Sequence, residues 1–216
     1  MLTVGFKKLS PMNLASHLDM MRAVMRTIAR ADIDVEMSKG FNPHKEIYVT
    51  PPLPLGVNSV SEYMTVYTSV DAESFLKKYN ACAVKGLEAF SAKRVEKNPN
   101  LAGIVTSADY EIRIDNAEAF KVAVNDMLNA SEYLLTAKNK DGQETVKDVR
   151  SKILSASVDG NILYLHLRAG NDNLRADKLF EKLCTITGEQ YFVGRITRTM
   201  LYTERDGKEV KFSELF

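Results

Sequence analysis

Strand-like and helix-like sequence patterns follow one another in a similar order twice along this chain of 216 residues. This repetition limits the folds that the chain can adopt. Alternating apolar and polar residues are typical of half-buried strands, whereas apolar residues that recur every three or four positions indicate one face of a helix. In the first half, these patterns predict helices at 11–31 and 71–79 and strands at 3–8, 33–37, 46–49, 63–68 and 87–95. In the second half, they predict helices at 116–129 and 174–187 and strands at 108–114, 133–138, 149–158, 162–167 and 196–203.

A turn-rich segment separates the two halves. Asn98-Pro99-Asn100, followed by Gly103, is the best candidate for a linker. We therefore expect two domains, 1–97 and 104–216. Each contains the order β-α-β-β-α-β with one strand more than that unit requires. We interpret this as an α+β protein made of two ferredoxin-like halves, each an antiparallel sheet with helices on one face.

Composition narrows the class of protein. The 29 basic and 28 acidic residues give a formal net charge of +1, which argues against a polyanion-coating surface but leaves room for a local basic patch. No apolar run is long enough for a membrane span, and Met1–Val4 leads into charged residues rather than into a signal peptide. We expect a cytoplasmic protein, away from membranes, with Cys82 and Cys184 reduced. Three histidines and two scattered cysteines predict no metal site and no cofactor.

The segment Ser38–Lys45, called the motif loop below, is rich in residues that define backbone geometry. Gly40 accepts a positive φ, and Pro43 fixes its own φ and favours an extended Asn42. We interpret the segment as a rigid ligand-binding loop. The alternative is a tight turn that happens to contain His44.

A second histidine lies in the predicted first helix. On a helical wheel, His17 falls in the same arc as Met21 and Ile28, so it is expected to point at the sheet. If that end of the helix faces the motif loop, His17 and His44 share one pocket. A neutral imidazole there is suited to general acid or base catalysis, because its unperturbed pKa is about 6.5. The alternative is that His17 is a hydrogen-bonded core residue.

Three arginines form a stripe on the same helix. Arg22, Arg26 and Arg30 are spaced four residues apart, and Asp19 is placed to pair with Arg22. Together with Lys39 and Lys45 of the motif loop, the stripe is expected to bind phosphate or carboxylate groups. The alternative is a solvated helix face.

Several short motifs together resemble those of a known bacterial family. They lie at 7–11, 14–22 (with Ser-His-Leu-Asp), 38–44 (with Gly-Phe-Asn-Pro-His), 53–56 and 61–63, with looser matches at 148–150 and 174–175. They are similar to the radical-SAM-linked family of unknown function, whose domain is fused to, or encoded beside, cobalamin-binding radical-SAM proteins. The resemblance implies a radical-SAM protein as partner and a link to RNA.

From the resemblance and the motif residues together, we expect an accessory protein rather than an enzyme. The resemblance implies that it binds or presents the substrate of a radical-SAM enzyme, with RNA as the expected substrate. One alternative is an RNA-processing or RNA-modifying enzyme in which His17 or His44 acts as general acid or base; the other is a docking subunit without a ligand. The expected ligand-binding residues lie on the first helix and the motif loop: Ser16, His17, Asp19, Arg22, Lys39, Gly40, Phe41, Asn42, His44 and Lys45.

Overall fold

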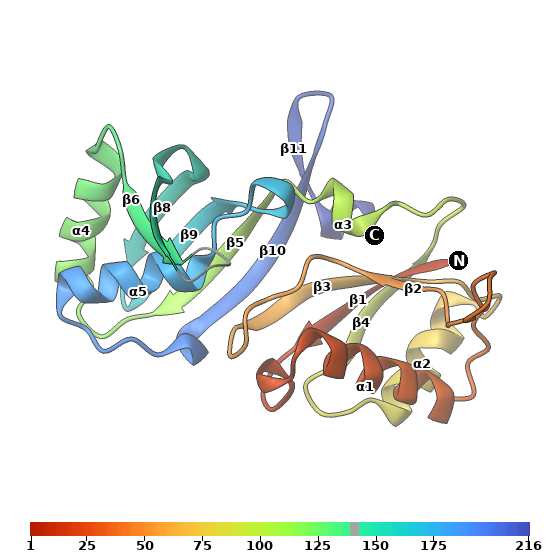
Figure 1. Cartoon of the computed structure of the whole chain (residues 1–216). Coiled ribbons are helices and arrows are strands. Elements are labelled where there is room, and N and C mark those ends of the chain that lie inside the picture. The colour runs from red at the N-terminus through yellow and green to blue at the C-terminus, as the bar shows by residue number, and fades with distance from the viewer. Residues whose placement is uncertain (139–142) are drawn as a thin grey trace.

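The computed structural model describes residues 1–138 and 143–216 and shows a mixed α+β fold built on one long sheet (Figure 1). Along this sheet the strands follow the order β4-β1-β3-β10-β5-β9-β8, with β2 paired to β3 and β11 paired to β10. Strands β3 and β10 are parallel, and the other described pairs are antiparallel. An α+β fold with a largely antiparallel sheet is therefore confirmed.

The strands are β1 (Leu2–Lys8), β2 (Ile47–Val49), β3 (Asn58–Val66), β4 (Ala89–Arg94), β5 (Ser107–Arg113), β6 (Leu134–Lys138), β7 (Glu144–Asp148), β8 (Ile153–Asp159), β9 (Ile162–Arg168), β10 (Ile196–Arg205) and β11 (Lys208–Lys211). The helices are α1 (His17–Arg30), α2 (Ala72–Cys82), α3 (Leu101–Ile104), α4 (Ala117–Asn129), α5 (Ala176–Thr187) and α6 (Phe212–Leu215). Four short 3-10 helices are η1 (Met12–Leu14), η2 (Arg150–Lys152), η3 (Gly170–Asp172) and η4 (Val193–Arg195).

In the first half, α1 and α2 lie on the same side of the strands, below the sheet in Figure 1. Val24 and Ile28 of α1 and Phe75 and Tyr79 of α2 are fully buried, in one cluster with Phe6 of β1. Burial of these large apolar side chains is what holds the helices on the sheet.

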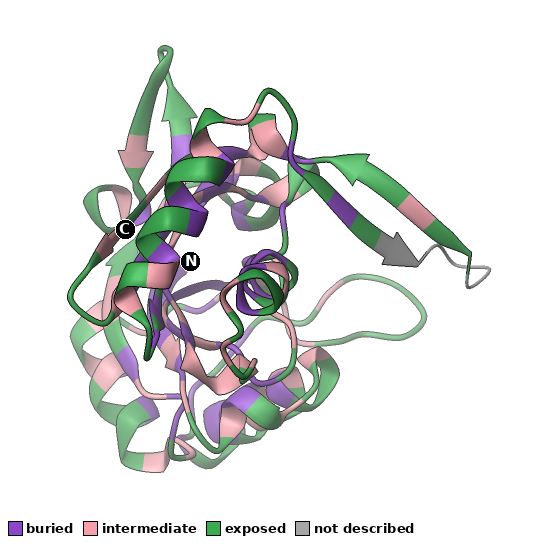
Figure 2. Cartoon of the chain, turned by 90° about the vertical axis from the view of Figure 1, so that its left-hand side faces the viewer, coloured by how far each residue is buried: buried purple, intermediate pink, exposed green. Residues whose placement is uncertain are grey.

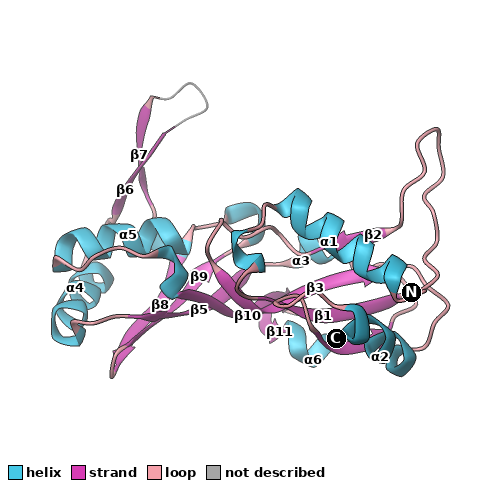
Figure 3. Cartoon of the chain, turned by 90° about the horizontal axis from the view of Figure 1, so that it is seen from below, coloured by secondary structure: helices cyan, strands magenta, loops and turns pink. Residues whose placement is uncertain are grey.

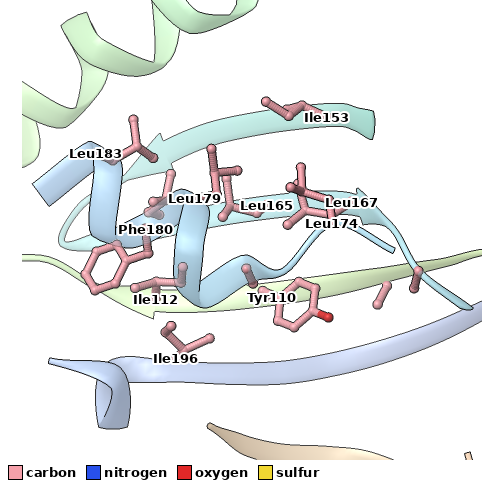
Figure 4. Packing of buried hydrophobic residues seen from close by; sticks show 14 of the residues in the cluster. Tyr110, Ile112, Ile153, Leu165, Leu167, Leu174, Leu179, Phe180, Leu183 and Ile196 are labelled. Carbon is pink, nitrogen blue, oxygen red and sulfur yellow. The ribbon is translucent and has the colours of Figure 1, made fainter. Parts of the chain in front are cut away.

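In the second half, α4 and α5 pack beside β5, β8, β9 and β10. Figure 4 shows Leu179, Phe180 and Leu183 of α5 together with Ile112 and Leu165 of the strands. These five residues are fully or almost fully buried, in one cluster. The hairpin β6–β7 forms a separate two-stranded sheet that stands out from the body and is mostly exposed (Figure 2).

The two halves meet where β3 runs beside β10. Asn58 pairs with Thr197, and Ser59 pairs with Arg198. Tyr63 of β3 is buried in the hydrophobic cluster of the second half rather than in that of the first. We call this region the junction, because main-chain pairing and side-chain packing both cross it here.

The start of α1 differs from the prediction. The helix begins at His17, not at Pro11, because Ser16 is the N-cap, accepting a hydrogen bond from the backbone N–H of Asp19 (3.2 Å). The preceding residues form η1 instead. Helix α1 buries Met20, Val24, Thr27 and Ile28. Leu14, in η1, and Leu18, in α1, are 69% and 65% exposed.

Other predicted elements also differ in extent. Residues 33–37 form no strand; Met37 makes an isolated bridge with Lys45. The predicted strand 149–158 begins only at Ile153, after η2. Strands β7 and β11 were not predicted, and the predicted turn at 139–142 lies outside the described residues. In the part of the chain that the structure describes, no helix has the length and apolar character needed to span a membrane.

Candidate functional site

The motif loop is closed at its base by hydrogen bonds between its two ends. The backbone N–H of Ser38 donates to the carbonyl of His44 (2.8 Å), and the N–H of His44 donates to Ser38 Oγ (3.0 Å). Ser38 Oγ also lies 2.8 Å from His44 Nδ1. Gly40 has a φ of 132°, which strains any residue with a side chain. The positive φ predicted for Gly40 is therefore confirmed, and the hydrogen bonds that close the loop come from Ser38 and His44.

The tip of the loop presents side chains to solvent. Phe41 is fully exposed, and Lys39, Asn42 and His44 are exposed as well, while Lys45 is partly buried. The loop projects beyond the sheet, between α1 and β2 (Figure 3). An uncovered aromatic ring, in a loop that also carries two lysines, is available to stack on a flat partner that carries negative charge.

At the start of α1, the predicted residues Ser16, Asp19 and Arg22 form one exposed cluster. Ser16 Oγ donates to Asp19 Oδ2 (2.7 Å), and Arg22 Nη1 donates to Asp19 Oδ1 (2.9 Å). The hydrogen bond from Ser16, followed by that from Arg22, lowers the pKa of Asp19. Because Asp19 already pairs with Arg22, this end of the helix carries little excess positive charge.

The arginine stripe is only partly free for a ligand. Arg30 donates from Nη2 to the carbonyl of Cys82 (2.9 Å), which ties α1 to the end of α2. Arg26 is exposed, and no hydrogen bond or ion pair joins it to the described residues. Of the three arginines, Arg26 is therefore the one most available to a phosphate.

The structure does not bring His17 and His44 together. His17 is the first residue of α1 and lines a small cavity with Lys8, at the end of β1. The motif loop follows the last turn of α1 and leads into β2, where Ile47 pairs with Val66 beside the start of β1. A helix of 14 residues is about 20 Å long, so the two imidazoles lie at opposite ends of it. Their predicted shared pocket is not formed.

Beside His17 lies a group of buried polar residues that the sequence analysis did not single out. We call Lys8, Thr50, Glu62 and Arg198 the junction cluster; each is at most 3% exposed. Arg198 donates to Glu62 Oε1 from Nη2 (2.5 Å) and from Nε (3.1 Å), and Thr50 Oγ1 donates to Glu62 Oε2 (3.2 Å). Glu62 and Arg198 come from different halves, so this ion pair crosses the junction.

Lys8 differs from its neighbours because it has no direct partner. Among the residues that the structure describes, none makes a hydrogen bond or an ion pair with its ammonium. Burial lowers the pKa of Lys8, and the nearby Glu62 carboxylate opposes that shift. The sequence did not indicate that Lys8 is buried, because a charged residue at the end of a strand is often exposed.

A cleft of about 210 Å³ lies at the junction, next to the junction cluster. One wall is 51–54, which precedes β3, and the other is formed by Gly170, Asn173 and the start of α5. The cleft adjoins a more open hollow of about 540 Å³, lined partly by the same residues. Both halves therefore contribute to this space, called the junction cleft below.

Arg175 and Asp177 lie at the border of the cleft and its open hollow. Arg175 donates to Asp177 Oδ1 from Nε (3.1 Å) and to Oδ2 from Nη2 (2.5 Å). Asp177 is 5% exposed, whereas the side chain of Arg175 is 52% exposed. The buried carboxylate thus holds a guanidinium that is half exposed.

The third histidine belongs to a separate hydrogen-bonded network on the sheet. His166 Nδ1 lies 2.6 Å from Asp109 Oδ1, and Nε2 lies 3.1 Å from Glu209 Oε1. Tyr202 donates to Asp109 Oδ2 (2.5 Å), and Ser107 donates to Glu209. The hydrogen bond with Asp109 is the largest of the effects that raise the pKa of His166. Since each group is engaged by another, we interpret the network as a structural link between β5, β9, β10 and β11.

The geometry thus defines a class of protein: a mixed α+β chain with one projecting aromatic loop and a buried ion cluster at the junction of its halves. Within residues 1–138 and 143–216, no group of three or more His, Cys, Asp or Glu side chains is arranged to hold a metal ion. The family model described as an uncharacterized protein conserved in bacteria (DUF2344) matches residues 2–176. The chain belongs to this bacterial family. No curated protein sequence matches it.

Proposed function

We propose that this protein is a non-enzymatic accessory protein that binds RNA through the motif loop and presents it to a radical-SAM enzyme. The observation that carries the RNA part is the full exposure of Phe41 at the tip of a hydrogen-bonded loop. A ring in that position contributes nothing to the core. It can stack on a base without first being uncovered.

The charges near Phe41 support a nucleic acid rather than an apolar partner. Lys39 and Lys45 belong to the same loop, two and four residues from Phe41 in the sequence, and Arg26 is exposed on the helix that leads to the loop. Phosphate contacts from such side chains supply affinity without base specificity. The net charge of the whole chain is only +1, so binding depends on this local arrangement.

The radical-SAM partner rests on the sequence resemblance described above. A binding protein whose own loop holds the substrate fits the role of an accessory subunit. We further propose that both halves are ferredoxin-like. Support comes from the parallel between the strand order β4-β1-β3-β2 in the first half and β10-β5-β9-β8 in the second, each with two helices.

Replacing Phe41 by alanine is expected to weaken single-stranded RNA binding about 5- to 150-fold, because stacking contributes about 1–3 kcal/mol per base. Fluorescence anisotropy with labelled oligonucleotides measures this. Tyr164→Ala, which removes a partly exposed ring on β9, is the matched control and should bind like the wild type.

The same assay in a salt series separates stacking from charge. Lys39→Ala with Lys45→Ala should reduce the slope of log affinity against log salt by about 1.4, since each contact to a single strand contributes about 0.7. Lys85→Ala with Lys97→Ala removes two exposed lysines elsewhere and should leave the slope unchanged. Wild-type affinity in the Phe41 and Lys39/Lys45 variants would contradict the proposal.

The two other functions predict different outcomes. An enzyme that uses one imidazole should lose single-turnover cleavage or modification of RNA in His17→Ala or His44→Ala. The separation of these residues means that each would have to act alone. A pure docking subunit should bind no RNA and should lose its radical-SAM partner when Asn42 or Phe41 is replaced.

A further inference from the structure

The charges of the junction cluster do not balance. Lys8 and Arg198 are cations, Glu62 is the acid between them, and all three are almost fully buried. Glu62 is held by Arg198 at 2.5 Å, which leaves Lys8 without a direct partner among the described residues. A buried ammonium is costly unless an anion or a hydrogen-bond acceptor compensates it. This excess of positive charge favours the binding of an anion that is not part of the chain.

The junction cleft is the space from which such a group can approach. Pro52 and Leu53 line both the cleft and the small cavity that contains Lys8 and His17. That small cavity has a volume of about 10 Å³, so it holds no more than about one water molecule. A larger anion must therefore lie in the cleft itself, where Arg198 is part of the lining.

Two arginines and the N-terminus of a helix border the cleft. Arg198 lines it from the sheet, and Arg175 borders it with a half-exposed side chain. Helix α5, 12 residues long, begins at Ala176 in the lining, and no side chain caps its N-terminus. Arg175 is paired with Asp177, and Arg198 with Glu62, so both ion pairs are close to neutral. The excess positive charge comes from Lys8, whose small cavity shares Pro52 and Leu53 with the cleft, and from the helix N-terminus.

We propose that the junction cleft binds a phosphomonoester of nucleotide size. Arginine side chains and a helix N-terminus together match the several oxygens of a phosphate. The proline-rich wall at 51–54, with Val57, offers an apolar surface for a sugar or base, and the adjoining hollow of about 540 Å³ gives it room. The phosphomonoester belongs either to a free nucleotide or to the phosphorylated end of an RNA. The second source rests on the proposed function; the first does not.

Titration calorimetry of the wild type with AMP, GMP, adenosine and inorganic phosphate tests the proposal. We expect either nucleotide to bind at least tenfold more tightly than adenosine. Adenosine binding as tightly as AMP, or no binding of AMP and GMP at millimolar concentration, would overturn it. A 5′-phosphorylated RNA compared with its 5′-hydroxyl form distinguishes the two sources: a preference for the phosphorylated end supports the RNA source, and equal affinity alongside AMP binding supports the free nucleotide.

Two variants assign the binding to the cleft. Arg175→Ala should weaken AMP binding at least tenfold, and Lys178→Ala, which removes an exposed lysine one turn along the same helix, should not. Lys8→Met should also weaken AMP binding at least tenfold. It should leave the melting temperature of the ligand-free protein equal or higher, because a buried charge without a partner is removed. Unchanged AMP affinity in both variants would overturn the assignment.

The same ligands keep this proposal distinct from the motif-loop proposal. Phe41→Ala should weaken binding of RNA and leave AMP affinity unchanged, because the motif loop and His17 lie at opposite ends of α1. Loss of AMP binding in Phe41→Ala would contradict the separation of the two sites.

Discussion

Replacing Arg198 by leucine should lower the free energy of unfolding by about 3–5 kcal/mol, because it leaves the Glu62 carboxylate buried without its main partner. Arg198 and Glu62 are 3% exposed, and two hydrogen bonds, at 2.5 Å and 3.1 Å, join the guanidinium to Glu62 Oε1. Lys8 is close enough to influence Glu62 but makes no ion pair with it. It therefore compensates only part of the loss.

Urea denaturation followed by circular dichroism measures this change. Arg205→Leu is the matched control, since Arg205 lies on the same strand but is exposed, and its replacement should change stability by no more than about 0.5 kcal/mol. If Arg198→Leu unfolds within about 1 kcal/mol of the wild type, the ion pair does not hold the junction.

Replacing Tyr63 by alanine is expected to have an effect of similar size, about 3–5 kcal/mol, through loss of packing. Tyr63 is 1% exposed, and its ring centroid lies 5.3 Å from Phe212, 6.0 Å from Phe90 and 6.2 Å from Phe216. It belongs to a strand of the first half but packs in the core of the second. Its removal should therefore loosen the contact between the halves as well as the core.

The distinguishing result is the number of transitions. In Tyr63→Ala, hydrogen exchange should show β1 and β9 opening at different urea concentrations, whereas in the wild type they open together. Tyr79→Ala is the control, because Tyr79 is also fully buried but lies within the core of the first half, stacked on Phe75. A single shared transition in Tyr63→Ala would show that this residue does not couple the halves.

Local patterns were sufficient to predict many of the elements. Asp71 caps α2 by accepting from the N–H of Ser74 (2.9 Å), and Gly188 ends α5 with a φ of 74°. Gly160 closes the hairpin between β8 and β9. In each case the signal is a residue whose side chain, or lack of one, determines the backbone within a few positions.

The junction was not predictable in the same way. Its central ion pair, between Glu62 and Arg198, joins residues 136 positions apart. The ion pair forms because β3 pairs with β10, and that pairing is short. Nothing in the alternation around Glu62 or Arg198 distinguishes a buried charge from one on an exposed strand face. The pairing of the two halves determines which side chains of β3 and β10 are buried. The junction cluster can therefore be identified only from the three-dimensional structure.

The candidate site was predicted in part. Gly40 of the motif loop has the expected positive φ, but His17 does not meet His44. The reason is the direction of α1: it starts at His17, near the end of β1, and the whole helix lies between His17 and the segment that leads to the loop. The sequence shows that His17 lies in the predicted helix and that His44 follows it. It does not show at which end of the helix each imidazole lies.

Ultraviolet crosslinking of the wild-type protein to single-stranded RNA, followed by trypsin digestion and mass spectrometry, tests most directly whether the motif loop contacts RNA. We expect the nucleotide adduct on the peptide Gly40–Lys45, which contains Phe41, and expect it to disappear in Phe41→Ala. Adducts confined to peptides of the second half, with none on Gly40–Lys45, would contradict the proposal that this loop is the RNA-binding surface.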